Sequence, residues 1–187
     1  MEKLDTVLTP HSLIGLHGYA RAGKDTAAQG LVERGFARVA FADPLRRALY
    51  RINPWVGPGD LRSVVDVEGW EKAKARPEVR RLLQELGVSM REEADPDVWV
   101  NAAMREAVRR DVPVVFSDTR FPNEARAIRA NGGLVIRVDR PGTEPALGHY
   151  SDNPLPTHLI DATVANTSTP SALQAEVVRI AEEGGLL

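Results

Sequence analysis

The sequence predicts an α/β fold in which a five-stranded parallel sheet is flanked by helices, and two observations support this prediction. First, five short apolar segments alternate with segments of helical periodicity along the 187 residues. Strands and helices that alternate in this way form parallel sheets with right-handed crossovers. Second, the first apolar segment leads directly into a glycine-containing loop and then into a helical pattern. A chain of this length suits one compact domain with a modest insertion.

The loop from Gly18 to Lys24 has the phosphate-binding spacing G-x-x-x-x-G-K. Its glycines allow the backbone to come close to a ligand, so that successive N–H groups point at anionic oxygens. The helix that begins near Lys24 adds the positive end of its dipole, and the lysine supplies a mobile charge for β- and γ-phosphates. The motif therefore predicts a polyphosphate site, against the alternative of a glycine-rich turn with a chance lysine.

The residue after the lysine departs from the common motif. Asp25 stands where Ser or Thr usually binds Mg²⁺, and Thr26 follows one place later. The pattern G-K-x-T is closer to that of nucleoside monophosphate kinases than to that of GTPases or motor ATPases. Asp25 either holds Mg²⁺ through a water or caps the helix, and the sequence leaves both interpretations open.

The expected elements follow from the apolar periodicity and from glycine and proline signals. Strands are expected at residues 12–17, 36–41, 112–116, 134–138 and 162–166. Helices are expected from the loop to about Arg34, from Asp43, near 59–66 and 68–75, over 77–86, from Asp95 to about Arg110, from Phe121 to about Asn131, and from Thr169 or Ser171 to Glu183. Gly35 and Gly87 should end the helices before them, and Asp43 should be an N-cap with Pro44 in the first turn.

Several polar side chains follow directly after predicted strands, where open α/β sheets bind ligands. Asp43 is expected both to cap its helix and to lie at the site. Asp118 follows a buried strand and suits a carboxylate that positions Mg²⁺ or water, with an ordinary strand-end turn as the alternative. Arg120 either holds a phosphate or pairs with Glu124. Arg140 is expected to contact a phosphate.

The composition excludes several classes of function. The 24 Lys and Arg residues and 26 Asp and Glu residues give a net charge of −2, so no global basic field favours nucleic-acid binding. The absence of cysteine excludes disulfides and thiolate metal sites, and the four histidines lack paired ligand spacing. No apolar run approaches the roughly 20 residues that cross a membrane. Charged residues stand where a signal peptide has its apolar core, so we expect a cytoplasmic protein.

The sequence suggests one domain with three functional parts. The core is expected at about 12–51 and 111–187, a helical segment at about 52–110, and a lid at about 140–157, a long polar loop that contains His149. Trp55 and Trp70 fall in the helical segment. They either stack on a base or anchor a small helical flap.

Taken together, these motifs occur in the order found in bacteriophage deoxynucleoside monophosphate kinases, which the chain resembles over nearly its whole length. The most distinctive match is Asp118-Thr119-Arg120-Phe121-Pro122-Asn123-Glu124. The other matches are the Gly18–Thr26 loop, Phe41-Ala42-Asp43-Pro44-Leu45-Arg46, Leu83-Gln84-Glu85-Leu86-Gly87 with Arg91, Asp97-Val98-Trp99, and Val135-Ile136-Arg137-Val138-Asp139-Arg140-Pro141 leading to His149.

The resemblance implies a P-loop kinase that uses ATP and Mg²⁺ to phosphorylate a deoxynucleoside 5′-monophosphate in nucleotide biosynthesis. Its implied ATP-binding residues are Gly18, Tyr19, Ala20, Arg21, Ala22, Gly23, Lys24, Asp25 and Thr26, with Arg137 and Arg140 closing on the transferred phosphoryl group and Asn166 near the base. Its implied monophosphate-binding residues are Asp43, Gln84, Arg91 and Arg120, supported by Trp99. Its implied catalytic residues are Lys24, Arg120, Arg140 and Asp118, and its candidate metal ligands are Asp25, Thr26 and Asp118.

The resemblance also suggests a homodimer, and host cytoplasm as the location if the protein is phage-encoded. Other functions stay open at this stage. The chain could be a P-loop kinase for another small acceptor, such as dephospho-coenzyme A or a metabolite. It could also be a nucleotide-binding module without turnover. An end-kinase acting on nucleic acid would need a basic groove, which the net charge argues against.

Overall fold

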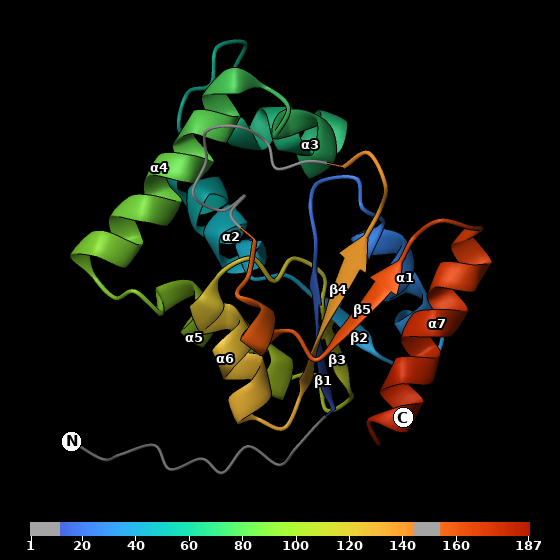
Figure 1. Cartoon of the computed structure of the whole chain (residues 1–187). Coiled ribbons are helices and arrows are strands. Elements are labelled where there is room, and N and C mark those ends of the chain that lie inside the picture. Colours follow the sequence, from blue (N-terminus) through green and yellow to red (C-terminus); the bar gives the residue numbers. More distant parts are fainter. Residues whose placement is uncertain (1–11, 144–153) are drawn as a thin grey trace, which may run out of the picture. The chain divides into compact units, whose positions relative to one another are not determined.

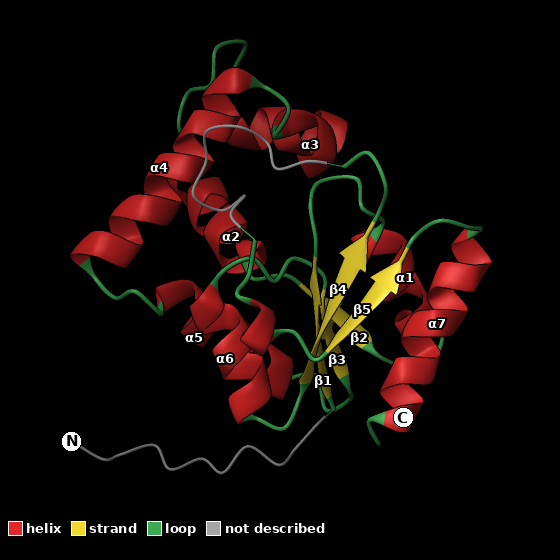
Figure 2. Cartoon of the chain, in the orientation of Figure 1, coloured by secondary structure: helices red, strands yellow, loops and turns green. Residues whose placement is uncertain are grey.

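The computed structural model describes residues 12–143 and 154–187 and contains a five-stranded parallel sheet (Figures 1 and 2). The strands are β1 (Leu13–His17), β2 (Ala37–Val39), β3 (Val114–Phe116), β4 (Leu134–Asp139) and β5 (Ala162–Ala165). Their order across the sheet is β2-β3-β1-β4-β5. The predicted fold class is therefore confirmed. Residues 144–153, which hold most of the expected lid and His149, lie outside the described residues.

The helices of the described residues follow the strands as expected, with small differences at their ends. They are α1 (Lys24–Val32), α2 (Ala42–Ile52), α3 (Leu61–Ala73), α4 (Pro77–Glu93), α5 (Val98–Val108), α6 (Pro122–Ala130) and α7 (Pro170–Glu183), with a short 3₁₀ turn, η2 (Thr157–Leu159). Gly69 breaks α3 with a non-helical backbone, close to the gap expected between two short helices. Thr169 caps α7 by accepting a hydrogen bond from the Ala172 N–H. In the part of the chain that the structure describes, no helix is long and apolar enough to cross a membrane.

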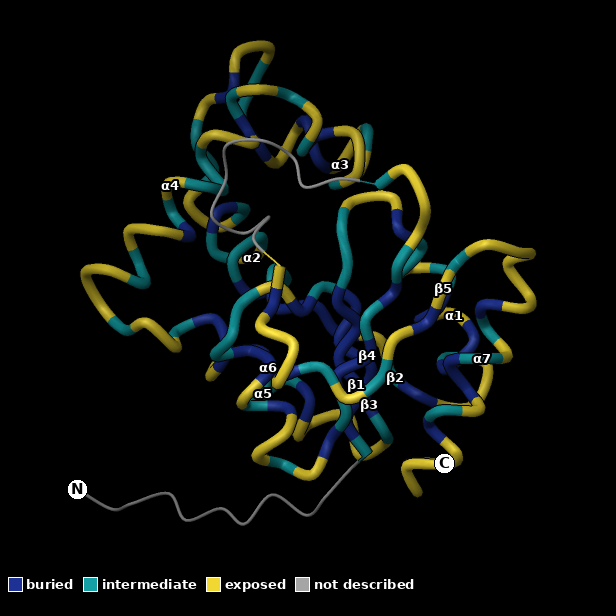
Figure 3. The backbone as a smooth tube through the Cα atoms, viewed as in Figure 1, coloured by how far each residue is buried: buried dark blue, intermediate teal, exposed yellow. Residues whose placement is uncertain are grey.

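The central strand β1 is buried on both faces because two helical layers cover the sheet. Ile14 and Leu16 pack in a cluster with apolar residues of α1 and α7 on one face. Gly15 points to the opposite face, where a Cβ atom would lie 2.5 Å from the Ile128 Cδ1 of α6. Figure 1 shows α1 and α7 on one side of the strands and α6 on the other, and in Figure 3 the central strands β1 and β3 are dark blue, which marks buried residues. The sequence of a strand covered on both faces is a nearly continuous run of apolar residues, which is why β1 could be predicted.

The strand order creates a topological switch point beside β1. The chain leaves β1 through α1 toward β2, whereas it leaves β3 through α6 toward β4, on the other face of the sheet. The loops after β1 and β3 therefore diverge, although their strands are paired from Leu13↔Val114 to Gly15↔Phe116. Open α/β sheets bind their ligands at such a point, beyond the carboxyl ends of the strands.

The chain divides into two compact units, each with its own apolar packing. One holds the sheet and comprises the chain up to Ala40 and from Met104 onward, and the other is the helical unit Phe41–Ala103. The second begins earlier than the expected residue 52, because Leu49 of α2 packs with Leu61 and Val79 of α3 and α4. Trp70 also packs against this cluster, as an anchoring residue would, whereas Trp55 is 69% exposed.

The prediction that Gly87 ends its helix is wrong. The helix α4 continues through Gly87 to Glu93. Gly87 is buried, and a Cβ atom there would already be in contact with Leu45 Cδ2 of α2 at 3.4 Å. The packing of α4 on α2 therefore continues the helix through Gly87, against the local tendency of glycine to stop a helix.

The prediction that Asp43 is an N-cap is also wrong. Helix α2 begins at Ala42 with Phe41 in the cap position, so Asp43 lies inside the first turn. A carboxylate in this position still interacts favourably with the positive end of the helix dipole. The remaining differences are shifts of the expected boundaries: β2 is shorter than 36–41, β3 begins at Val114 rather than 112, α1 ends at Val32 and α5 at Val108.

The close approach of α1 and α7 can be tested with two glycine substitutions. A Cβ atom at Gly30 would lie 2.8 Å from the Gln174 Cβ and 3.0 Å from its Cα, so the helices would have to separate. Overpacking of this kind costs about 1–3 kcal/mol, more than the gain of about 1 kcal/mol when alanine replaces glycine in a helix. We expect Gly30→Ala to lower the free energy of unfolding measured by chemical denaturation.

Gly87→Ala is the matched control, because its new Cβ atom would meet Leu45 at an ordinary contact distance. It should leave the free energy of unfolding unchanged or raise it by up to about 1 kcal/mol. Equal stabilisation by both substitutions would contradict the packing of α1 on α7.

Candidate active site

The loop between β1 and α1 has a backbone that only glycine fits at two positions. Gly18 has φ 141° and Gly23 has φ 106°. A Cβ atom at Gly18 would lie 2.4 Å from the Val138 carbonyl oxygen, and one at Gly23 would lie 2.5 Å from the Asn166 Nδ2. The loop is thus held against the carboxyl ends of β4 and β5, and the Asn166 amide also donates to the Ala22 carbonyl at 2.9 Å. The contact of Asn166 with an ATP base stays a prediction.

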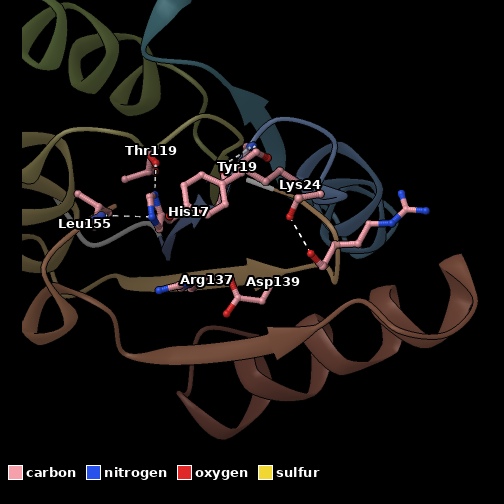
Figure 4. A network of polar contacts seen from close by, with 10 residues as sticks. His17, Tyr19, Lys24, Thr119, Arg137, Asp139 and Leu155 are labelled. Atoms are coloured by element: carbon pink, nitrogen blue, oxygen red, sulfur yellow. Dashed lines mark hydrogen bonds and ion pairs between the residues drawn. The ribbon is translucent and has the colours of Figure 1, made fainter. Parts of the chain in front are cut away.

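The Lys24 ammonium lies against the carbonyls of its own loop (Figure 4). Its Nζ donates to the Gly18 oxygen at 2.7 Å and to the Tyr19 oxygen at 2.8 Å. The helix α1 begins at this lysine, and no side chain caps its N-terminus. A partly buried cation beside an uncapped helix N-terminus is a favourable environment for phosphate oxygens.

Asp25 forms an ion pair that the sequence did not reveal. The interpretation that it caps α1 is wrong, because Gly23 occupies the cap position. Instead, the Asp25 Oδ1 accepts from the Arg38 Nη2 at 2.6 Å, and the Arg38 Nε donates to the buried Ser117 hydroxyl at 3.1 Å. Arg38 on β2 thereby links the start of α1 to the end of β3.

The turn after β3 presents Asp118 and Arg120 on a backbone that is fixed at several points. The Thr119 N–H donates to the Leu16 carbonyl at 3.1 Å. The carboxylate of Glu124, which is only 2% exposed, accepts from the backbone N–H groups of Arg120 at 2.7 Å and of Phe121 at 3.0 Å. A carboxylate that reaches back to the first residues of its own helix resembles one half of a capping box.

This geometry rules out one of the two interpretations of Arg120, and the phosphate contact stays a prediction. Glu124 binds the Arg120 amide rather than the guanidinium, so the predicted side-chain pair is wrong. The Arg120 side chain is exposed and makes no ion pair within residues 12–143 and 154–187. An exposed guanidinium on a fixed backbone is suited to bind a phosphate.

The two arginines at the end of β4 differ in their contacts. Arg140 is exposed and its Nη1 lies 3.4 Å from the Arg21 carbonyl oxygen of the glycine loop. Arg137 is partly buried, and its Nε donates to the Asp139 carboxylate at 2.6 Å. Arg140 therefore reaches the predicted phosphate site, whereas the contact made by the Arg137 guanidinium is with its own strand.

His17, which the sequence analysis did not single out, joins three segments at the end of β1 (Figure 4). The ring is 5% exposed, its Nδ1 lies 3.1 Å from the Thr119 carbonyl oxygen, and its Nε2 lies 3.3 Å from the Leu155 backbone nitrogen. A carbonyl can only accept and an amide N–H can only donate, so Nδ1 carries the proton and the ring is neutral. Burial is the main cause that lowers the pKa of His17 below its ordinary value of 6.5, and the charges of Arg137 and Lys24 act in the same direction.

Two of the predicted monophosphate-binding residues in the helical unit bind the same carbonyl. The Gly87 oxygen accepts from the Arg91 Nη1 and from the Trp99 Nε1, both at 3.1 Å. Gln84 and Arg91 are partly exposed on the face of α4 that contains Gly87, and Trp99 is 6% exposed. Asp43 lies on α2, which packs on α4, and its carboxylate is 3.6 Å from the Arg46 guanidinium. Trp99 therefore supports Arg91 from inside the unit.

The oxygen ligands present suit a metal that is shared with substrate phosphates. In the described residues, no group of three or more His, Cys, Asp or Glu side chains could hold a metal by itself. Mg²⁺ in phosphoryl-transfer sites usually takes one or two protein oxygens and fills its other positions with phosphates and water. Thr26, Asp118 and the second oxygen of Asp25 fit this requirement.

Comparisons with known proteins find one family and a viral relative that match most of the chain. A family model described as "Deoxynucleotide monophosphate kinase" matches residues 63–177. A protein of Acanthamoeba polyphaga mimivirus, provisionally named deoxynucleotide monophosphate kinase, is 30% identical over 188 residues, which cover 89% of this chain and 94% of that protein.

Three solved kinase structures are similar at low sequence identity. Dephospho-CoA kinase from Campylobacter jejuni has a TM-score of 0.48 at 11% identity, covering 91% of this chain and 96% of that one. Shikimate kinase from Aquifex aeolicus has a TM-score of 0.45 at 12% identity, covering 94% and 98%. APS kinase from Mycobacterium tuberculosis has a TM-score of 0.43 at 14% identity, covering 92% and 98%. TM-scores this low support no conclusion about this chain.

The role of Glu124 can be measured by removing its carboxylate. Glu124→Ala leaves two partly buried N–H groups without their acceptor and should lower the free energy of unfolding by about 1–3 kcal/mol. Glu124→Gln keeps one carbonyl oxygen in reach of both N–H groups and should recover most of this loss. If both variants were as stable as the wild type in chemical denaturation, the carboxylate would not hold the turn.

His17 predicts a pH dependence of stability. Because its pKa is lowered in the folded state, the unfolded chain binds a proton at pH values where the folded chain does not. The contribution is complete above the ordinary pKa of 6.5 and is lost as the pH falls through it toward the lower folded-state pKa. Between about pH 7 and 5, the wild type should therefore lose more unfolding free energy than His17→Asn, which cannot titrate there. Parallel curves for the two proteins would contradict the neutral ring.

Proposed function

Because the chain belongs to the deoxynucleotide monophosphate kinase family, we propose that it transfers the γ-phosphoryl group of ATP to a deoxynucleoside 5′-monophosphate, with Mg²⁺. The products are ADP and the deoxynucleoside diphosphate. The observation that carries this proposal is the glycine loop, where positive-φ glycines, an uncapped helix N-terminus and the Lys24 ammonium occur together after β1, as a polyphosphate site requires. The homodimer stays a prediction.

In this proposal the sheet unit binds ATP. The backbone of the loop from Gly18 to Thr26 holds the phosphates, and Lys24 exchanges its two carbonyl partners for oxygens of the β- and γ-phosphates. Arg140 already reaches the Arg21 carbonyl of this loop and would bind the γ-phosphoryl group. Thr26 and Asp118 would hold Mg²⁺, which neutralises phosphate charge when it is bound.

The helical unit holds most of the residues proposed for the monophosphate. Gln84 and Arg91 share one face of α4, and the Trp99 ring fixes the carbonyl that Arg91 also contacts. Asp43 lies in the first turn of α2. Arg120, on the turn after β3 in the sheet unit, is a further residue proposed for phosphate, because a guanidinium suits bidentate binding of phosphate oxygens.

The chemistry needs no nucleophilic side chain. A phosphate oxygen of the monophosphate attacks the γ-phosphorus, the bond to the β–γ bridging oxygen breaks, and ADP leaves. Charge in the transition state is spread over the γ-phosphoryl oxygens, so fixed cations accelerate the step. Lys24, Arg120 and Arg140 are the proposed cations.

The acceptor can be identified with purified protein, ATP-Mg²⁺ and each of the eight common ribo- and deoxyribonucleoside monophosphates, read out by coupled ADP release. We expect turnover with at least one deoxynucleoside monophosphate. Turnover only with dephospho-coenzyme A or another small acceptor would assign a different kinase, and ATP binding without ADP release in any mixture would indicate a binding module.

Substitution of the proposed cations should separate binding from transfer. Lys24→Ala should reduce kcat/KM by roughly 100- to 1,000-fold, the usual effect of removing a group that stabilises transition-state charge. Arg140→Ala should lower kcat more than it raises the KM for ATP, because its contact strengthens as charge develops. The control is Arg179→Ala, an exposed arginine on α7 that pairs with Glu176 and Glu183. Near-normal turnover in both active-site variants would contradict the proposal.

A further inference from the structure

The carboxyl ends of β1 and β3 stay bonded beyond their sheet pairing, and the backbone of one residue, Thr119, makes both bonds. The sheet register ends at Gly15↔Phe116. Past this point, the Thr119 N–H donates to the Leu16 carbonyl at 3.1 Å and the Thr119 carbonyl accepts from the His17 Nδ1 at 3.1 Å. These two bonds attach the peptide groups on either side of Thr119, in the turn after β3, to the end of β1.

This fixed backbone leads directly to Arg120. The Arg120 N–H is itself held by the buried Glu124 carboxylate at 2.7 Å. The Thr119 carbonyl and the Arg120 N–H belong to one peptide group, so His17 and Glu124 hold its two ends. The Thr119 hydroxyl takes no part, because its Oγ1 is buried without a hydrogen-bond partner in the part of the chain that the structure describes.

We propose that neutral His17 is a positioning residue for phosphoryl transfer, which holds the Thr119 carbonyl through its Nδ1–H and thereby sets the direction of the Arg120 side chain. Its Nε2 accepts from the Leu155 N–H and keeps the ring in this tautomer. The inference rests on the proposed function and adds a residue that none of the sequence motifs contains.

The surroundings of the ring favour this neutral form. The charged groups that act on it are Arg137, which is in register with His17 on β4, Lys24 of α1, and Asp139 at the end of β4. The two cations oppose a second proton, and burial opposes it more strongly than the Asp139 carboxylate favours it. A protonated ring would also place an Nε2–H against the Leu155 N–H, two donors with no acceptor between them.

Two substitutions separate the two ring nitrogens. The amide of His17→Asn can replace Nδ1–H as the donor to the Thr119 carbonyl, whereas the amide of His17→Gln can replace Nε2 as the acceptor from Leu155. If the Thr119 bond sets Arg120, His17→Asn should keep kcat within about threefold of the wild type, whereas His17→Gln should lose roughly 10- to 100-fold, since small misplacements of a catalytic group have effects of this size. The KM for ATP should change little in either variant. The matched control is His158→Asn, an exposed histidine of η2.

Equal kcat values for the Asn and Gln variants, or a loss in KM alone, would overturn the proposal. If a variant does not fold, a measurement on the wild type still tests the proposal. Long-range ¹H–¹⁵N NMR spectra of the histidine rings should show His17 protonated at Nδ1 and not at Nε2, and an Nε2–H tautomer would overturn the proposal. Absence of wild-type turnover with any monophosphate would remove the proposed function instead, and the NMR result would still decide whether the ring holds the turn.

Discussion

The hydrogen bonds that join the carboxyl ends of β1 and β3 determine where the functional groups of the sheet unit lie. One side of this junction carries the glycine loop and Lys24, and the other carries Asp118 and Arg120. The two strands diverge into helices on opposite faces, so the loops would separate without further contacts. His17 and the Thr119 backbone supply those contacts, and the buried Glu124 carboxylate holds the turn after β3 from within. A hydrogen bond lost at a buried position costs more than one lost at the surface.

Local signals were sufficient to predict the parallel sheet and the phosphate loop. An apolar run such as Leu13–Leu16 can be read as a buried strand because both its faces are covered. Gly18 and Gly23 could be recognised because the positive φ angles and close contacts at these positions leave room for no other residue. The same holds for the Asp118–Glu124 motif, in which Glu124 binds amides only three and four residues before it.

Interactions between distant segments were not predictable in the same way. Nothing near Asp25 indicates that Arg38 will neutralise it, and nothing near His17 indicates a bond to Leu155, because both contacts exist only once the chain has folded. At Gly87, a local signal was present but gave the wrong structure. The local tendency of glycine to end a helix led to a wrong prediction, because the packing of α4 on α2 outweighs that tendency. The residues proposed for the monophosphate come from motif resemblance alone, because their contacts also depend on how distant segments fold together.

The central claim is that the glycine loop and Lys24 bind the phosphates of ATP, and a crystal structure with a non-hydrolysable ATP analogue tests it most directly. The account predicts phosphate oxygens on the backbone N–H groups of residues 19–24. It also predicts that the Lys24 Nζ leaves the Gly18 and Tyr19 carbonyls, now at 2.7 and 2.8 Å, for the β- and γ-phosphates. A nucleotide bound elsewhere, with Lys24 still on both carbonyls, would contradict the claim.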